Sequence, residues 1–483
     1  MFKSLVFSCM AILIVSMAYS QNFVNSGAII NRGSGSTFTV KGSFTNNASG
    51  TFDNNNHGSL TIDSTFNQNA AAGSFVTDSG IVAYSGSNAQ AVVATVRGAQ
   101  YGALIAGGSS TKSLAGSVVV MDSVQLGSTL AVNGHQLSVL GVSAFTGAGT
   151  LTANGGSDTV NYAGTVNQNV RGTTYGNLIA SGSATSTKTA AGAVTVNNKV
   201  TNGDTLDFAG NVFTYTGATN GITNNGTIRS GAAVSMTSQT TIGNAFVYTQ
   251  ASAGQTVAPA NYTDLSLTGG TKSIASGDTT SVAGSYNVTG SGARNYAGSW
   301  FRYNGSTQSV LGEPYNNLTL VGADTSIAKT AVSGVTVGGT LANRAGTFDL
   351  AANTLTLTVP ANGHSNTGRI RYAGTGTVVD STAGIIEYYA SSGSQTVGLG
   401  TYHNILLSNA ATKTVSGGVV RALSDINVPS GAVTVASAAT LQTIGNMTLL
   451  GGTTLGNAGS LFVTQTLNNA GTITNTGAVQ IGQ

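Results

Sequence analysis

The stretch Tyr84-Ser-Gly-Ser-Asn-Ala-Gln-Ala-Val92 opens the pattern that decides the fold of this chain. A second tyrosine follows at Tyr101, then the apolar pair Leu104-Ile105, then Lys112 and Gly116. This order of residue types occurs five times along the sequence. Such a repeat is typical of an elongated scaffold in which each unit contacts only its neighbours, and it argues against a compact catalytic domain.

Rare residue types mark equivalent positions in the five copies. The first repeat tyrosines are Tyr84, Tyr162, Tyr248, Tyr303 and Tyr388, and the second are Tyr101, Tyr175, Tyr262, Tyr315 and Tyr402. The repeat glutamines, each in a Gln-x-Val motif, are Gln90, Gln168, Gln255, Gln308 and Gln395. The repeat lysines are Lys112, Lys188, Lys272, Lys329 and Lys413. The chain has only eight lysines and sixteen tyrosines, so this sorting indicates a true repeat.

The spacing and the local pattern favour a solenoid. The second tyrosine recurs after 74, 87, 53 and 87 residues, which a stack of coils tolerates because coils can be added or lost. Between Gly127, Gly134 and Gly141 run Leu130-x-Val132 and Leu137-x-Val139. Alternation at period two indicates short strands joined by glycine or asparagine turns. We predict an all-β, right-handed parallel β-helix (β-solenoid) with coils of about 20–25 residues.

A shorter motif places asparagines before a Gly-Thr or glycine turn between two apolar residues. It runs from Phe44 to Phe52 through Asn46-Asn47, and it returns in residues 222–228, 341–348 and 467–473. Asparagine side chains on successive coils can hydrogen-bond to one another along the stack. We therefore predict asparagine ladders at these positions.

Residues 1–20 have the features of a secretory signal peptide. Lys3 supplies the positive start, residues 5–17 are apolar, and Ala18-Tyr19-Ser20 supplies small residues for the peptidase. Cleavage near Ser20 predicts an extracellular or outer cell-surface location, and Cys9, the only cysteine, would be removed with the leader. We expect Asn- and Gly-rich coils over 21–80, five irregular solenoid repeats over 81–440, and further Asn- and Gly-rich coils over 441–483.

The composition argues against several classes of partner. Charged residues make up 7% of the chain, compared with about 25% in ordinary globular proteins. Without Lys3, 17 basic residues face 15 acidic residues, so we expect no nucleic-acid partner. No later stretch of about 20 apolar residues exists, so we expect no transmembrane helix in the mature chain.

The polar residues form no recognisable catalytic or metal-binding constellation. The four histidines do not stand at metal-ligand spacing, and Glu313 and Glu387 are the only glutamates. Asp204 and Asp207 could share a strand neighbourhood, although such residues more often cap turns. We expect no enzyme activity, no metal and no cofactor.

The repeat lysines are the best candidate contact residues. Copies about 20 Å apart would exceed the Debye length of about 8 Å and act as separate contacts along an extended anionic polysaccharide. The alternative is that each lysine is a solvated charge at a sheet edge that discourages aggregation. The repeat tyrosines are either wall or core residues with their hydroxyls at the rim, or an exposed row that stacks on sugar rings.

The run from Ile386 to Val397, followed by Tyr402-His-Asn-Ile-Leu-Leu and Thr412-Lys413-Thr, resembles repeats in large surface proteins of the Bacteroidetes and Chlorobi. The Asn-Gly-Thr coils look like passenger regions of autotransporter and filamentous-haemagglutinin-type adhesins. The resemblance implies a secreted or cell-surface structural or adhesive β-solenoid that contacts surface or matrix glycans.

The sequence leaves two other functions open. One is a self-assembling filament or sheath subunit joined end to end, because residues 477–481 look like an uncapped strand. The other, less favoured, is a polysaccharide-active β-helix enzyme.

Overall fold

The computed structural model describes residues 22–26, 29–31, 35–47, 50–53, 57–69, 75–95, 100–237, 240–252, 254–358, 364–374 and 383–482. The predicted signal peptide lies outside these residues. The described residues form strands, turns and bends without a helix, and parallel strands stack as a β-solenoid, which confirms the predicted fold class. Over the same ranges, nothing qualifies as a membrane-crossing helix. The chain divides into two units, residues 1–235 and 236–483.

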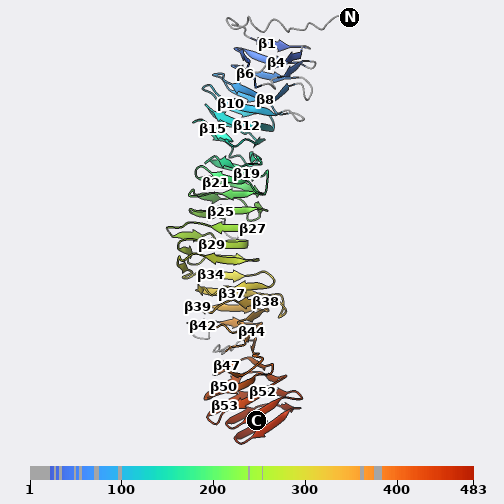
Figure 1. The fold of residues 1–483 in the computed structure, drawn as a ribbon, viewed down its shortest axis with the longest axis vertical. Helices are drawn as coiled ribbons and strands as arrows, with labels where there is room; N and C mark the ends of the chain where they lie inside the picture. The colour runs from blue at the N-terminus through green and yellow to red at the C-terminus, as the bar shows by residue number, and fades with distance from the viewer. Residues whose placement is uncertain are drawn as a thin grey trace, which may run out of the picture. The chain divides into compact units, whose positions relative to one another are not determined.

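In the first unit, successive coils add parallel strands to common sheets (Figure 1). One sheet contains β8 (Phe75–Tyr84), β10 (Tyr101–Ala106), β12 (Val118–Leu126), β14 (Gln136–Val139), β17 (Thr159–Tyr162), β19 (Thr174–Ala180) and β21 (Val194–Asn202), in this order. A second contains β9 (Gln90–Val92), β11 (Lys112–Leu114) and β13 (Leu130–Ala131). Further along, β18 (Gln168–Val170), β20 (Thr187–Ala190) and β22 (Thr205–Asp207) pair in series.

In the second unit, each coil near the C-terminus contributes one strand to each of three sheets. Strands β51 (Ile426–Val428), β52 (Ala432–Val435) and β53 (Ala439–Thr443) pair with β54 (Met447–Leu449), β55 (Thr454–Asn457) and β56 (Ser460–Val463), respectively. Ile426 lies opposite Met447, which lies opposite Leu467. One coil therefore takes about 20 residues, as the sequence predicts.

The core follows from the alternation along these short strands. In β53 the side chains of Ala439, Leu441 and Thr443 are buried and the two between them are half-buried. Because β-strand side chains point alternately to opposite faces, one set from every strand fills the inside of the coil. Each fully buried valine or leucine stabilises the stack by about 1.5–3 kcal/mol.

Two glycines of the predicted turns have identifiable roles. Gly134, between β13 and β14, has a φ of 82°, and its neighbour Asn133 has a φ of 57°. Both lie in the left-handed region that glycine and asparagine adopt most readily. At Gly141, a Cβ atom would lie 1.7 Å from the carbonyl oxygen of Asp122 in the preceding coil. The first glycine permits the corner, and the second permits close approach of two backbones.

The predicted asparagine ladders are present along the stack. Side-chain amides donate to side-chain oxygens one coil away in the pairs Asn25–Asn46, Asn46–Gln68, Asn202–Asn224, Asn343–Asn366 and Asn457–Asn475, at 2.7–3.1 Å. Three of the four predicted motifs contribute to these pairs. The fourth does not, because Asn468 and Asn469 are exposed and the ladder there uses Asn457 and Asn475.

Candidate functional site

The repeat lysines lie inside the protein. Each has a side chain no more than 1% exposed. They lie on β11, β20, β30 (Lys272–Ile274), β38 (Ala328–Ala331) and β49 (Thr412–Val415). In each strand the residue two positions further on is also buried, so alternation directs the lysine into the coil.

This placement corrects the predicted roles of Lys112, Lys188, Lys272, Lys329 and Lys413. A row of polymer contacts and a set of solvated edge charges both require exposed ammonium groups, and these are covered. Both interpretations of the lysines are therefore wrong. A lone lysine is usually exposed, whereas here the backbone supplies acceptors for the buried charge.

Every repeat lysine donates to the same carbonyl, that of the residue two positions after the first repeat tyrosine. The acceptors are Gly86, Gly164, Gln250, Gly305 and Ala390. The Nζ–O distances are 2.7 Å for Lys112, 2.8 Å for Lys272 and 3.2 Å for Lys413. The lysine therefore binds a corner of the preceding coil.

The repeat glutamine binds the other side of the same corner. In all five copies the glutamine lies directly opposite the lysine in the parallel ladder. Its side-chain oxygen accepts the N–H of the corner residue at 2.8–3.2 Å. The glutamine and the lysine together satisfy both backbone groups of one corner residue, which is buried in three copies (Gly86, Gly164 and Ala390) and half-buried in the other two. A buried backbone group left unpaired would cost about 1–3 kcal/mol.

The repeat tyrosines bind a second backbone corner. In each copy the two hydroxyl oxygens lie 2.7–3.2 Å apart. The first hydroxyl accepts an N–H, and the second donates to the carbonyl of that same residue, three positions after the glutamine. The residues bound in this way are Val93, Arg171, Ala258, Leu311 and Gly398.

All ten repeat tyrosines are no more than 1% exposed, so the core interpretation is confirmed. Their hydroxyls are paired within the coil and do not reach a rim, and a row that stacks on sugars is excluded. Burial raises the pKa of Tyr84 and Tyr162 to about 12. The hydroxyls therefore stay protonated and remain hydrogen-bond donors well above neutral pH. We call the four repeat residues of one copy, with the two corners that they bind, a corner module.

Sequence reasoning missed a further tyrosine pair. Tyr286 and Tyr296 are buried and share a hydrogen bond between their hydroxyls. No Gln-x-Val motif stands between them, so they do not match the repeat. Two tyrosines ten residues apart in a chain with few aromatics were the available signal.

Burial lowers the pKa of the repeat lysines. The pKa of Lys329 falls to about 8, and that of Lys413 also falls to about 8 although the charge of Glu387 opposes the shift. The pKa values of Lys112 and Lys272 are also lowered, chiefly by burial. Burial lowers the pKa of Lys188 too, and Asp204 partly offsets this.

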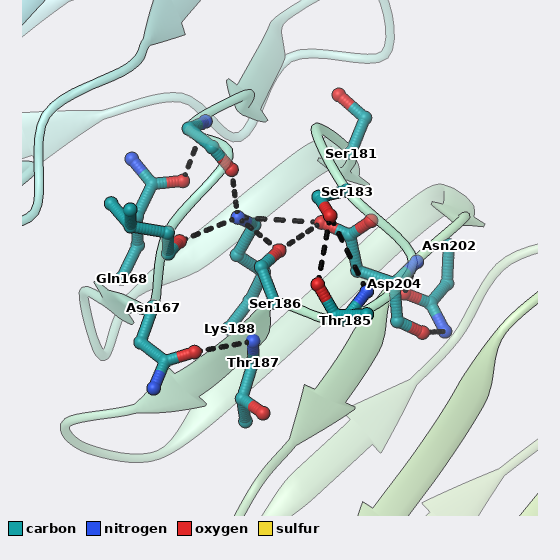
Figure 2. Close-up of polar contacts among 12 residues, drawn as sticks. Asn167, Gln168, Ser181, Ser183, Thr185, Ser186, Thr187, Lys188, Asn202 and Asp204 are labelled. Atoms are coloured by element: carbon teal, nitrogen blue, oxygen red, sulfur yellow. Dashed lines mark hydrogen bonds and ion pairs between the residues drawn. The ribbon is translucent and has the colours of Figure 1, made fainter.

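The copy at Lys188 is distinct because it contains a carboxylate (Figure 2). Lys188 Nζ lies 3.3 Å from Asp204 Oδ2, and the two side chains are 0% and 2% exposed. Ser186 Oγ lies 2.9 Å from Nζ and 2.8 Å from Oδ2, so it bridges the pair. Among the residues that the structure describes, no other repeat lysine has an ion-pair partner.

Asp204 and Asp207 have different partners. Asp204 contacts Lys188, whereas Asp207 Oδ1 accepts the N–H of Ala209 at 2.7 Å and so caps its own turn. The turn-capping interpretation holds for Asp207. Within the described ranges, no group of three His, Cys, Asp or Glu side chains could hold a metal ion.

A cluster of charged and aromatic residues, which the sequence did not reveal, lies on the outer face of the second unit. Strands β41 (Thr347–Asp349), β44 (Arg369–Tyr372) and β45 (Ile385–Tyr388) place Asp349, Arg371 and Glu387 opposite one another. Arg371 Nε lies 2.8 Å from Glu387 Oε2, and its guanidinium carbon lies 4.1 Å from the centre of the Tyr389 ring. Tyr389 donates to Asp349 at 2.7 Å. We call these four residues the outer-face cluster.

The chain matches no protein-family model, no curated protein and no solved structure. The fold and the side-chain contacts are therefore the basis for a functional proposal.

Proposed function

We propose that this chain is a secreted or cell-surface structural β-solenoid that serves as a stem or scaffold. One observation carries the proposal. The residue types that the repeat retains, namely tyrosine, glutamine and lysine, all bind backbone corners in the interior. A repeat devoted to binding a ligand would instead keep its rare residues accessible.

The nature of the exposed surface supports the same proposal. The lysines of the corner modules are covered, so the outside of the coils is built mainly from Ser, Thr, Asn and Gly, with few charges. Such a surface is hydrated but offers little charge for strong, specific binding. It suits a spacer that stays soluble among polymers.

We place the adhesive part of the proposal, contact with surface or matrix polysaccharide, at the outer-face cluster. There a guanidinium group, two carboxylates and a phenol lie together on one sheet face. Arg371 and Asp349 are 29% and 17% exposed, so solvent reaches both. Side chains of these types can hydrogen-bond to sugar hydroxyls and pack against a sugar ring.

Surface labelling tests the proposed secreted or cell-surface location. Antibodies against the purified protein, applied to intact cells of the source organism, should label the outside, and N-terminal sequencing of the mature protein should begin just after Ser20. Protein found only inside the cells, with an intact N-terminus, would contradict the proposal.

A glycan array tests the adhesive part. The mature protein should bind a subset of polysaccharides and release no sugar products from them. Arg371→Gln should weaken this binding, whereas Arg229→Gln should not, because Arg229 is an exposed arginine in the first unit. Release of products would favour the enzyme. Concentration-dependent oligomers in sedimentation would favour the filament subunit.

A further inference from the structure

The lysine–aspartate pair of the corner module at Lys188 differs from an ordinary surface ion pair. Lys188 and Asp204 are buried, and Ser186 is 2% exposed. Two charges held away from water lose hydration that their attraction recovers only in part. The other four corner modules place a lysine at the same position, with no carboxylate at ion-pair distance in the described residues. The carboxylate is therefore not needed to bury the lysine.

The backbone holds the two side chains in fixed positions. Lys188 lies on β20 directly opposite Leu206 of β22, and Asp204 immediately precedes β22. Asn202 holds the backbone of Asp204 on both sides, because its Oδ1 accepts the Asp204 N–H at 3.2 Å and its Nδ2 donates to the carbonyl at 3.0 Å. The amine and the carboxyl group therefore have little freedom to separate.

Ser186 bridges the two groups beside their direct contact of 3.3 Å. Its Oγ is 2.9 Å from Lys188 Nζ and 2.8 Å from Asp204 Oδ2, as the dashed lines in Figure 2 show. A hydroxyl group can accept one proton while it donates another. The contact from Nζ through Oγ to Oδ2 is thus a continuous path for proton transfer.

We propose that Lys188 and Asp204 condense to form an isopeptide bond that covalently links adjacent coils. Proton transfer from Nζ through Ser186 to Oδ2 first gives a neutral amine and a neutral carboxylic acid. Nζ then attacks Cγ, and a second proton moves from nitrogen to Oδ2. The Cγ–Oδ2 bond breaks, and Oδ2 leaves as water. The ammonium and the carboxylate thus become one secondary amide and one water molecule, with no oxidant or reductant.

Position and environment both promote this reaction. Groups held in a reactive orientation can reach effective concentrations of about 10⁵–10⁸ M. Bulk water, which would hydrolyse the amide, has little access to a side-chain pair that is 0% and 2% exposed. The product is neutral and so removes the two buried charges.

Tryptic peptide mapping of the unfolded protein tests the proposal. Trypsin should fail to cut after Lys188, and it should yield segment 172–199 joined to segment 200–229, with a mass one water molecule below their sum. Lys329 and Lys413 have no carboxylate partner in the described structure and serve as internal controls that trypsin should cut. Normal cleavage after Lys188, with segment 200–229 at its unmodified mass, would overturn the proposal.

A variant tests the role of the serine. Ser186→Ala keeps both reacting groups and removes the proton path, so the linked peptide should form at least several-fold more slowly after refolding. Asp204→Ala should abolish it and should still fold, because four corner modules lack the carboxylate. If the linked peptide forms equally fast in Ser186→Ala, proton transfer does not pass through Ser186. If it persists in Asp204→Ala, the proposed bond between Lys188 and Asp204 is wrong.

Discussion

At the scale of single residues, the central finding is that a lysine can serve as a backbone cap. Its ammonium group donates to up to three carbonyl oxygens, as Lys272 does with Gln250, Thr268 and Gly270 at 2.6–3.1 Å. The aliphatic part of the side chain packs in the coil. The glutamine opposite accepts the remaining N–H. Neither the lysine nor the glutamine alone would pair both the N–H and the carbonyl group of the corner residue.

The buried lysines predict an unusual dependence of stability on pH. The pKa of Lys329 is about 8 in the folded protein and about 10.4 when unfolded. Between these values the unfolded state binds more protons, so the stability of the fold should rise with pH. Lys329→Met should remove the contribution of Lys329 to this increase in the free energy of unfolding. That contribution is about 1–2 kcal/mol after allowance for solvent screening. Thermal unfolding of both proteins from pH 7 to 10 checks this, and parallel profiles would contradict it.

The repeat tyrosines predict the opposite trend at higher pH. The pKa of Tyr162 is about 12 in the fold and about 10 when unfolded. A tyrosine whose pKa is higher in the folded state stabilises the fold fully at a pH below its pKa in the unfolded state. This stabilisation is lost as the pH rises through the pKa in the folded state. Phenolate absorbance should therefore appear together with unfolding, above about pH 11. Ten tyrosines that titrate near pH 10 in a protein that remains folded would be inconsistent with paired hydroxyls.

At the scale of strands and their ladders, asparagine pairs should contribute unequally according to burial. Asn202→Ala removes a fully buried amide that donates to Asn224 at 2.7 Å, and it should destabilise the fold by about 1–3 kcal/mol. Asn198→Ala removes an exposed hydrogen bond of 2.8 Å to Asn177, and it should cost less than about 0.5 kcal/mol. Chemical denaturation of the two variants makes the comparison. Equal losses would show that the interior ladder has no special role.

The strands themselves could be predicted from the sequence, but the use of the lysines could not. Period-two alternation and the Gly134 corner depend on residues close together in the chain, so local patterns reveal them. The carbonyl that Lys112 binds belongs to Gly86, in the preceding coil. The spacing held a clue, because each repeat lysine follows its glutamine by 17 to 22 residues, close to one coil. The outer-face cluster likewise depends on register between strands, which no single segment specifies.

At the scale of the whole molecule, a solenoid should respond to damage locally. Each coil contacts only its neighbours, so stability is close to a sum over coils and their interfaces. Tyr162→Phe should speed amide hydrogen exchange in the coils of β17, β19 and β21, and leave residues 426–463 unchanged. Exchange that rises equally in both regions would indicate one cooperative unit and would contradict this expectation.

Lysine accessibility in the native mature protein tests the central claim most directly. Amine acylation followed by peptide mapping should label Lys41, whose side chain is 62% exposed, and Lys199 rapidly, while all five repeat lysines stay protected. After unfolding, Lys112, Lys272, Lys329 and Lys413 should become reactive, whereas an isopeptide-linked Lys188 would not. Repeat lysines that react in the folded protein as fast as Lys41 would place them on the surface, and the account of the corner modules would then be wrong.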